Sequence, residues 1–136
     1  MEVKDRLLEC GVKPSLQRMA IMNFLVKNPI HPTVDLIFTE LYPSIPTLSK
    51  TTVYNTLKLL EEQGAIHSLN IDEKNVRYDA DISNHAHFKC KKCGQVQDVR
   101  LKDTDSIQIA NADKWLITEC QIYYKGYCEK CRNEMN

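Results

Sequence analysis

The stretch that decides the fold is residues 85–94, which read HAHFKCKKCG. Within it, Cys90 and Cys93 are separated by two residues and followed by a glycine, a spacing that lets two thiolates reach one metal ion across a tight turn. A second pair with the same spacing, Cys128 and Cys131, follows after 34 intervening residues. Four thiolates complete a tetrahedral site with no open position, so the two pairs predict a structural Zn²⁺.

Composition limits the class of protein. The chain has 136 residues, six cysteines and equal numbers of Lys plus Arg and of Asp plus Glu. Its length fits one compact domain or two small ones. No apolar run approaches the roughly 20 residues that cross a bilayer, and the first residues lack the pattern of a secretory signal, so we expect a soluble, cytoplasmic protein with no membrane partner. In that reducing compartment, paired cysteines favour metal binding over the alternatives of disulfides or unrelated thiols.

The N-terminal half has the signals of four helices, over residues 2–10, 15–28, 33–41 and 49–62. Ser15, Thr33 and Ser49 are the expected N-caps of the last three, and glycines follow the first and the fourth. For the second helix the expected buried stripe is Leu16, Met19, Ala20, Phe24 and Leu25.

Two short strands, 65–71 and 75–79, are expected next, around a turn at 72–74. Helices followed by a β-hairpin predict a winged helix-turn-helix, with 33–42 and 49–62 as its helix pair.

The fourth helix has two different faces. Val53, Leu57 and Leu60 recur at helical spacing and are expected to pack inward. The opposite face carries lysine, threonine, tyrosine and asparagine, which are side chains that contact DNA phosphates and base edges. An ordinary amphipathic surface helix is the alternative. The overall charge is balanced, and a local excess of five basic over two acidic residues between Gly11 and Leu60 indicates DNA only weakly.

The C-terminal half has a different pattern. Residues 80–84 are expected to be a hinge, followed by a small lobe with strands at 85–89, 96–101 and 116–124 and a helix at 103–112. Its aromatic residues are expected in the core or in a dimer interface: Trp115, Tyr123, Tyr124 and Tyr127. The predicted fold class is therefore α+β, a winged helix-turn-helix domain plus a small α/β domain that contains the zinc site.

His85 and His87 form a second candidate metal site. Two residues apart on a strand, their imidazoles project to the same side. Asp79, Asp81 and Asp98 are near in sequence, and imidazole with carboxylate suits Fe²⁺, Mn²⁺ or Zn²⁺. Asp81 is the weakest member because hinge aspartates are commonly solvated. Two ordinary surface histidines are the alternative interpretation.

Several motifs together resemble the ferric uptake regulator superfamily of metal-dependent bacterial repressors. They are Gly11-Val12-Lys13 with Gln17-Arg18, His31-Pro32-Thr33, Thr52-Val53-Tyr54-Asn55 with Leu57, Arg77-Tyr78-Asp79, the block from 85 to 94, and the terminal cysteine pair. The resemblance covers nearly the whole chain.

The resemblance implies the assembly and the sites. It implies a DNA-binding domain at 1–79, a hinge at 80–84 and a dimerisation domain at 85–136, with a homodimer that binds an inverted-repeat operator in double-stranded DNA. The DNA-contacting residues are then Lys13, Arg18, Lys50, Thr51, Thr52, Tyr54, Asn55 and Lys58. The implied regulatory site for Fe²⁺ or Mn²⁺ is His31, Asp79, His85, His87 and Asp98, and the inclusion of His31 rests on the resemblance alone.

Both carboxylates of that set are aspartates. The resemblance associates aspartates with peroxide-responsive repressors and glutamates with iron-responsive ones, so it implies that peroxide oxidises the residues matching His31 and His85 when Fe²⁺ is bound. A further metal site of many iron regulators is in doubt, because Asn84 and Ala86 replace its ligands.

Three alternatives remain open. The first is an iron-responsive repressor. The second is a non-haem iron enzyme, because these enzymes also combine histidines with a carboxylate; the helical first half and the short remainder favour a protein that is not an enzyme. The third is a zinc-ribbon interaction module with no role in DNA binding.

Overall fold

A computed structural model describes residues 2–71, 75–82, 86–100, 110, 112–117 and 120–135 of the chain. The chain divides into two units, residues 1–83 and 84–136. The predicted turn at 72–74, the predicted ligand His85, and most of the predicted helix at 103–112 lie outside the described residues. The predicted domain functions stay predictions.

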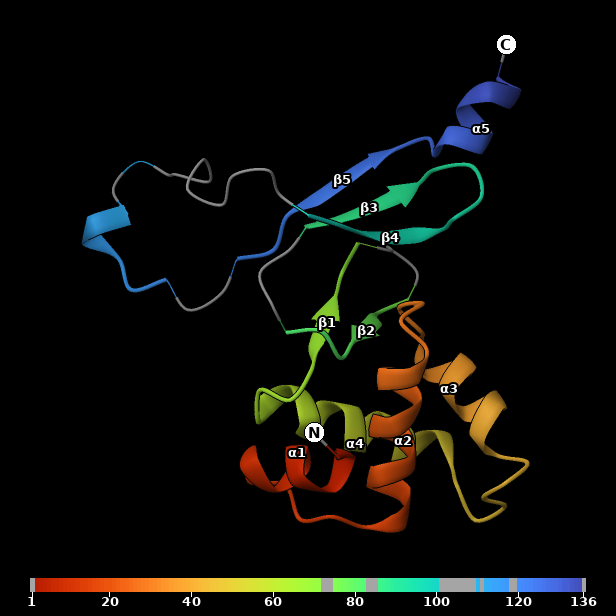
Figure 1. The fold of residues 1–136 in the computed structure, drawn as a ribbon, viewed down its shortest axis with the longest axis vertical. Helices are drawn as coiled ribbons and strands as arrows, with labels where there is room; N and C mark the ends of the chain where they lie inside the picture. Colours follow the sequence, from red (N-terminus) through yellow and green to blue (C-terminus); the bar gives the residue numbers. More distant parts are fainter. Residues whose placement is uncertain are drawn as a thin grey trace. The chain divides into compact units, whose positions relative to one another are not determined.

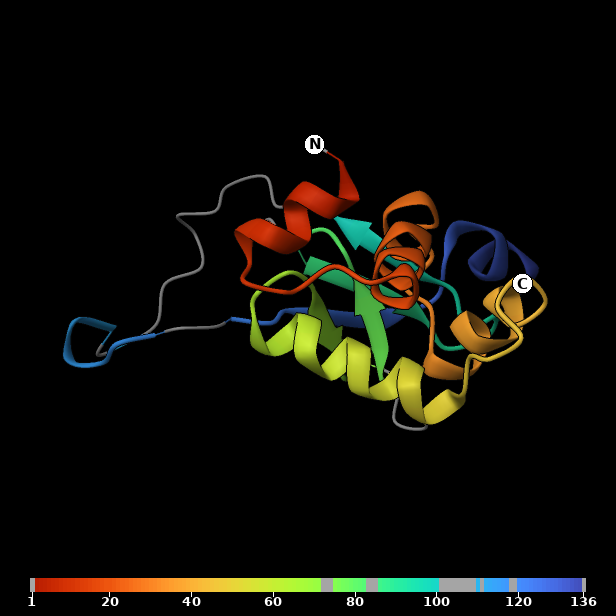
Figure 2. The ribbon, with the colours of Figure 1, turned by 90° about the horizontal axis from the view of Figure 1, so that it is seen from below.

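The first unit contains four helices followed by a hairpin (Figure 1). The helices are α1 Val3–Glu9, α2 Leu16–Lys27, α3 Val34–Leu41 and α4 Lys50–Glu62, and the strands are β1 His67–Leu69 and β2 Arg77–Asp79. The strands are antiparallel and shorter than predicted, with His67 opposite Asp79. Since α2 contacts α1, α3 and α4, it lies at the centre of the helices, above the long α4 in Figure 2. This arrangement confirms the predicted winged helix-turn-helix.

Local sequence signals fix the helix ends. The hydroxyls of Ser15, Thr33 and Ser49 accept hydrogen bonds from the backbone N–H groups three residues further on, as expected of N-caps. Gly64 has φ +77° and ends α4, a conformation that is strained for other residues.

The core of the first unit forms where the four helices meet the hairpin. Its fully buried residues include Leu7 of α1, Ile21 and Met22 of α2, Ile37 of α3, and Val53, Leu57 and Leu60 of α4. The predicted inward face of α4 is therefore confirmed.

The predicted stripe of α2 was partly confirmed, because Leu25 is buried and Met19 and Phe24 pack partly buried against the core. It was wrong for Leu16, which is 82% exposed, and it omitted the buried Ile21 and Met22. Apolar residues occur on every side of this helix, so its periodicity has little contrast. The helices that pack around α2, not its own pattern, decide which side chains are buried.

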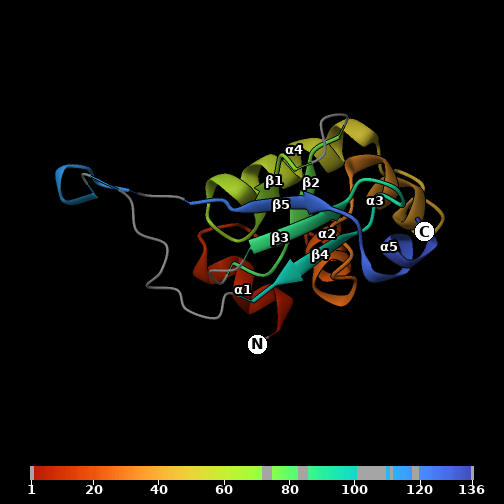
Figure 3. The ribbon, with the colours of Figure 1, turned by 90° about the horizontal axis from the view of Figure 1, so that it is seen from above.

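In the second unit, three strands form one sheet. They are β3 Ala86–Cys90, β4 Val96–Val99 and β5 Tyr123–Gly126, followed by α5 Glu129–Glu134. The central strand β3 pairs antiparallel with β4 and parallel with β5 (Figure 3). A 3₁₀ turn, Ala112–Lys114, precedes β5.

The predicted strand at 116–124 was wrong in position. Leu116 is 91% exposed and lies outside any strand, and pairing with β3 begins only at Tyr123. The apolar residues suggested a strand, but only tertiary pairing defines where it starts. Trp115, Tyr124 and Tyr127 are exposed, so their predicted core role was wrong; their dimer-interface role stays a prediction.

Within the described part of the chain, no helix has the length and hydrophobicity of a membrane span.

The corrected face of α2 can be tested with two matched substitutions. Leu25→Ala should lower the free energy of unfolding by about 2–5 kcal/mol, because it leaves a cavity in the core. Leu16→Ala in the same helix should change it by less than about 0.5 kcal/mol. Urea denaturation followed by circular dichroism measures both. Equal losses would contradict the burial described here.

Candidate metal centres

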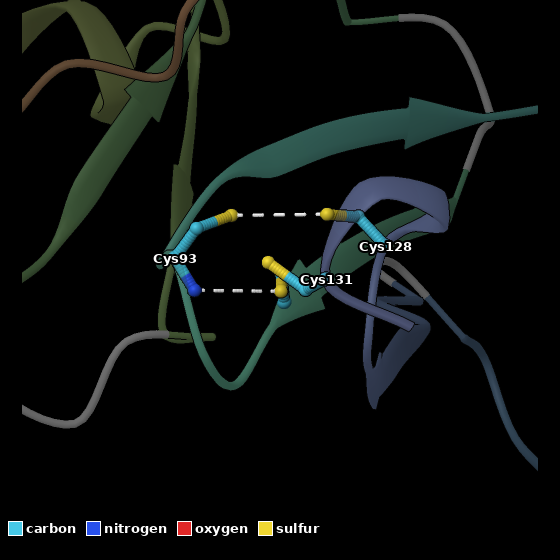
Figure 4. A group of neighbouring side chains, drawn as sticks. Cys93, Cys128 and Cys131 are labelled. Atoms are coloured by element: carbon cyan, nitrogen blue, oxygen red, sulfur yellow. Dashed lines mark hydrogen bonds between the residues drawn. The ribbon is translucent and has the colours of Figure 1, made fainter. Parts of the chain in front are cut away.

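The four predicted zinc ligands come together in the second unit. One Sγ atom from each of Cys90, Cys93, Cys128 and Cys131 lies within 4.8 Å of the other three. Figure 4 shows the side chains of Cys93 and Cys128 pointing toward each other, with their Sγ atoms 3.9 Å apart. Tetrahedral Zn²⁺ with Zn–S bonds of about 2.3 Å requires S–S separations of about 3.8 Å. The cluster therefore fits Zn²⁺.

Strand pairing explains why these distant cysteines meet. Cys90 is the last residue of β3, and its parallel partner on β5 is Gly126. The N–H of Lys91 donates to the Gly126 carbonyl at 2.7 Å, which extends this pairing past the end of the strand. Cys128 follows two residues later, and Cys131 lies on the first turn of α5. The pairing of β3 with β5 therefore brings Cys128 and Cys131 close to Cys90 and Cys93.

The turn between β3 and β4 forms a tight knuckle around Cys90. The Cys93 N–H donates to the Cys90 sulfur at 3.5 Å, and the Gly94 N–H donates to the Cys90 carbonyl at 3.0 Å. Gly94 has φ +78°, which the turn requires and which glycine adopts without strain.

The cysteines differ in acidity before any metal binds. Backbone N–H groups, first that of Cys93 and then that of Cys128, lower the pKa of Cys90 to about 6. Burial raises the pKa of Cys131 to about 12, with further increases from its neighbouring thiols. These shifts favour the thiolate at Cys90 and the thiol at Cys131. Since Zn²⁺ binds thiolates, its binding releases protons from the thiols of the cluster and becomes tighter as the pH rises.

The zinc site can be tested with a ligand substitution and a matched control. Cys131→Ser should lose the bound zinc and destabilise the second unit, because three thiolates no longer close the site. Cys120→Ser should keep both, because Cys120 is exposed and outside the cluster. Zinc content after dialysis and thermal unfolding are the measurements. A C131S protein that keeps one zinc per chain and the unfolding temperature of the wild type would contradict the assignment.

A histidine and a carboxylate also meet in the first unit. His31 Nε2 lies 3.6 Å from Asp79 Oδ2, and both side chains are almost fully buried. His31 is the only described non-glycine residue with positive φ, +58°, although it precedes a proline. Such a conformation costs of order 1–3 kcal/mol and persists where surrounding contacts impose it.

Residues beside Asp79 supply those contacts. The Tyr78 N–H donates to the Pro32 carbonyl at 3.0 Å, and Arg77 Nη1 lies 3.5 Å from the His31 carbonyl. β2 therefore positions the backbone of residues 31–32 as well as Asp79. Sequence reasoning missed this role of Arg77 and Tyr78, although their places directly before Asp79 were a usable signal.

A second histidine–carboxylate pair lies in the sheet of the second unit. His87 on β3 is directly opposite Asp98 on β4, and His87 Nε2 lies 3.3 Å from Asp98 Oδ1. The backbone N–H of His87 donates a hydrogen bond to the Ile122 carbonyl at 3.0 Å. Imidazole and carboxylate together suit Fe²⁺ or Mn²⁺, so each unit carries a pair of side chains that such a metal can bind.

The predicted DNA-contacting face of α4 is accessible in the first unit. Its exposed residues are Lys50, Thr51, Tyr54, Asn55 and Lys58. Thr52 is half-buried, and its hydroxyl oxygen accepts a hydrogen bond from the N-cap Ser49.

Two of the predicted DNA-contacting cations, Lys50 and Arg18, also make contacts within the first unit. Lys50 Nζ lies 3.2 Å from Asp35 and over the ring of Phe38. Arg18 donates from Nη1 to the carbonyl of Lys13, which is itself exposed. Their contacts with DNA stay a prediction.

A winged helix-turn-helix joined to a small sheet unit with a four-cysteine zinc site defines a class of metal-containing transcription regulators. The model of the ferric uptake regulator family matches residues 9–125, and the chain belongs to this family. The resemblance stated from the sequence is thereby confirmed.

The chain is similar to two curated peroxide-responsive regulators and to a solved ferric uptake regulator. The peroxide-responsive repressor PerR of Staphylococcus epidermidis is 33% identical over 132 residues, covering 96% of this chain and 88% of the relative. The peroxide operon regulator of Bacillus subtilis is 31% identical, covering 99% and 94%. Among solved structures, the ferric uptake regulator of Francisella tularensis with iron has a TM-score of 0.74 and 26% identity, covering 90% of this chain and 96% of that one.

Proposed function

We propose that this protein is a metal-dependent DNA-binding repressor that senses hydrogen peroxide through oxidation of its metal-ligand histidines. Family membership and the peroxide-responsive relatives support this proposal. The observation that carries it is the pairing of an aspartate with a histidine in each unit, Asp79 with His31 and Asp98 with His87. Aspartate at both positions is the feature that separates it from the iron-responsive alternative.

The proposed regulatory site consists of His31, Asp79, His85, His87 and Asp98 and takes Fe²⁺ or Mn²⁺. Two of these ligands come from the first unit and three from the second. A metal that needs ligands from both units favours the relative orientation in which all five can reach it. Its binding then selects that orientation by differential affinity, which is how a ligand shifts a conformational equilibrium.

Bound Fe²⁺ supplies the one-electron chemistry that activates hydrogen peroxide beside the imidazoles, whereas Mn²⁺ supplies coordination only. His31 and His85 are the residues proposed to be oxidised. In the overall reaction one imidazole C–H gains an oxygen atom from hydrogen peroxide, and the other oxygen leaves as water. The oxidised ring is a poorer nitrogen donor, so the site loses a ligand and the DNA-competent orientation loses its support.

The proposed partner is double-stranded DNA with an inverted repeat. A homodimer held by its second units would bring two α4 helices to successive major grooves, with Lys13, Arg18 and the exposed face of α4 contacting phosphates and bases. The protein would act in the cytoplasm and would not be an enzyme. The family match supports these assignments against the zinc-ribbon alternative.

The proposal is tested by operator binding with each metal. Duplexes selected from a random library by the Mn²⁺-loaded protein should contain an inverted repeat. Hydrogen peroxide should abolish binding of the Fe²⁺-loaded protein and leave the Mn²⁺-loaded protein unaffected, because only Fe²⁺ activates peroxide. Gel-shift titration measures both affinities.

Mass spectrometry supplies the internal control. Peptides that carry His31 or His85 should gain one oxygen atom with Fe²⁺ and peroxide. His67, one of the four histidines in the chain, lies outside the proposed site and should remain unmodified. Iron-dependent binding that peroxide does not change would instead identify an iron-responsive repressor.

A further inference from the structure

Arg6 connects three parts of the first unit. Its Nη2 donates to the carbonyl of Ala65 at 2.9 Å and also to the carbonyl of Ala80. Ala65 follows the glycine that ends the recognition helix α4, and Ala80 follows the proposed metal ligand Asp79. One guanidinium group on α1 therefore joins the end of α4 to the residue beside Asp79.

A second side chain holds the same segment further along. His67 on β1 has its Nε2 3.3 Å from the carbonyl of Ile82, and the Asp81 N–H donates to Asp79 Oδ1 at 2.9 Å. Residues 80–82, the described part of the predicted hinge, are thus attached to the first unit by polar contacts at both ends.

Apolar packing holds the start of this segment, where Ala80 is buried in the core of the first unit, but not its end. A cavity of about 550 Å³ lies beside it, lined by Arg6, by Leu25, Val26 and Pro29 of the α2 region, and by residues 79–82. Ile82 is 49% exposed. Because the cavity leaves one side of this backbone without packed neighbours, the hydrogen bond from Arg6 to the Ala80 carbonyl adds a directional restraint on its position.

We propose that Arg6 is a positioning residue that fixes Asp79 relative to α4 and thereby couples regulatory-metal binding to DNA binding. This inference rests on the proposed function. Arginine suits the task because its guanidinium is planar, always charged and able to donate several hydrogen bonds in fixed directions. Charge-assisted bonds to carbonyls are stronger than neutral ones.

Removing Arg6 should reduce the fraction of molecules in which Asp79 is in position to bind the metal. Without Arg6, Asp79 and the backbone after it sample more positions, and a smaller fraction of molecules has the ligand in place. Apparent metal affinity falls in proportion to that fraction. The same loss of restraint weakens the link from the metal site to the end of α4, so metal binding improves DNA affinity less.

The test compares Arg6→Gln with Lys4→Gln, which removes an exposed cation from the same helix. The readouts are the Mn²⁺ dissociation constant, the ratio of operator dissociation constants without and with Mn²⁺, and the unfolding temperature. For R6Q we expect roughly tenfold weaker Mn²⁺ binding and a similarly reduced operator ratio. K4Q should stay within about twofold of the wild type in both quantities.

The conservative variant Arg6→Lys separates positioning from stability. Lysine keeps the charge but lacks the planar fork, so R6K should lie between R6Q and the wild type. It is also the decisive variant if R6Q does not fold. Wild-type Mn²⁺ affinity and operator ratio in a folded R6Q or R6K protein, whatever the unfolding temperature, would overturn the inference. Wild-type protein with no Mn²⁺-dependent operator binding would instead overturn the proposed function.

Discussion

The meeting of four thiolates from Cys90, Cys93, Cys128 and Cys131 is the constraint on which the second unit depends. Among the described residues of that unit, the buried hydrophobic side chains are Ala86, Cys90, Val96 and Cys131, so two of the four are zinc-site cysteines. A core this small provides little hydrophobic stabilisation. Zinc binding then contributes directly to the folding free energy, as in other small metal-containing domains.

The zinc site also affects the proposed regulatory site, because the β3–β4 hairpin carries ligands of both sites. The turn that joins β3 to β4 is the knuckle formed by Cys93 and Gly94 around Cys90. The same two strands place His87 opposite Asp98. By fixing the turn, the zinc fixes the register, and the register holds the imidazole and the carboxylate 3.3 Å apart. The zinc site would in this way position two ligands of the proposed regulatory site.

Local chemistry in the sequence predicted much of this structure. N-cap residues such as Ser49, the apolar face of α4 and the cysteine spacing act over a few residues, and they were read correctly. The register of β5, the buried side of α2 and the contacts of Arg6 depend on segments that are distant in sequence. No short-range rule contains that information. The inclusion of His31 came only from resemblance, because nothing in the spacing of the chain points to it.

In the first unit, the backbone of His31 is strained. His31 has a left-handed backbone conformation before a proline, held by hydrogen bonds from the strand that carries Asp79. His31 lies between the end of α2 and Thr33, the N-cap of α3, so helix and cap signals do not specify its backbone geometry. Strained positions of this kind concentrate at functional sites. His31 and Asp79 thus form one histidine–carboxylate pair, and His87 and Asp98 form another.

The central claim is that these two pairs serve a single regulatory metal. Mn²⁺ titration of zinc-loaded protein tests it most directly, with Asp79→Asn and Asp98→Asn compared with Asp81→Asn, whose carboxylate is outside both pairs. We expect one Mn²⁺ per wild-type chain, a loss of Mn²⁺ affinity of roughly tenfold or more in each of the first two variants, and no change in the third. Wild-type Mn²⁺ affinity in either Asp79→Asn or Asp98→Asn would contradict it.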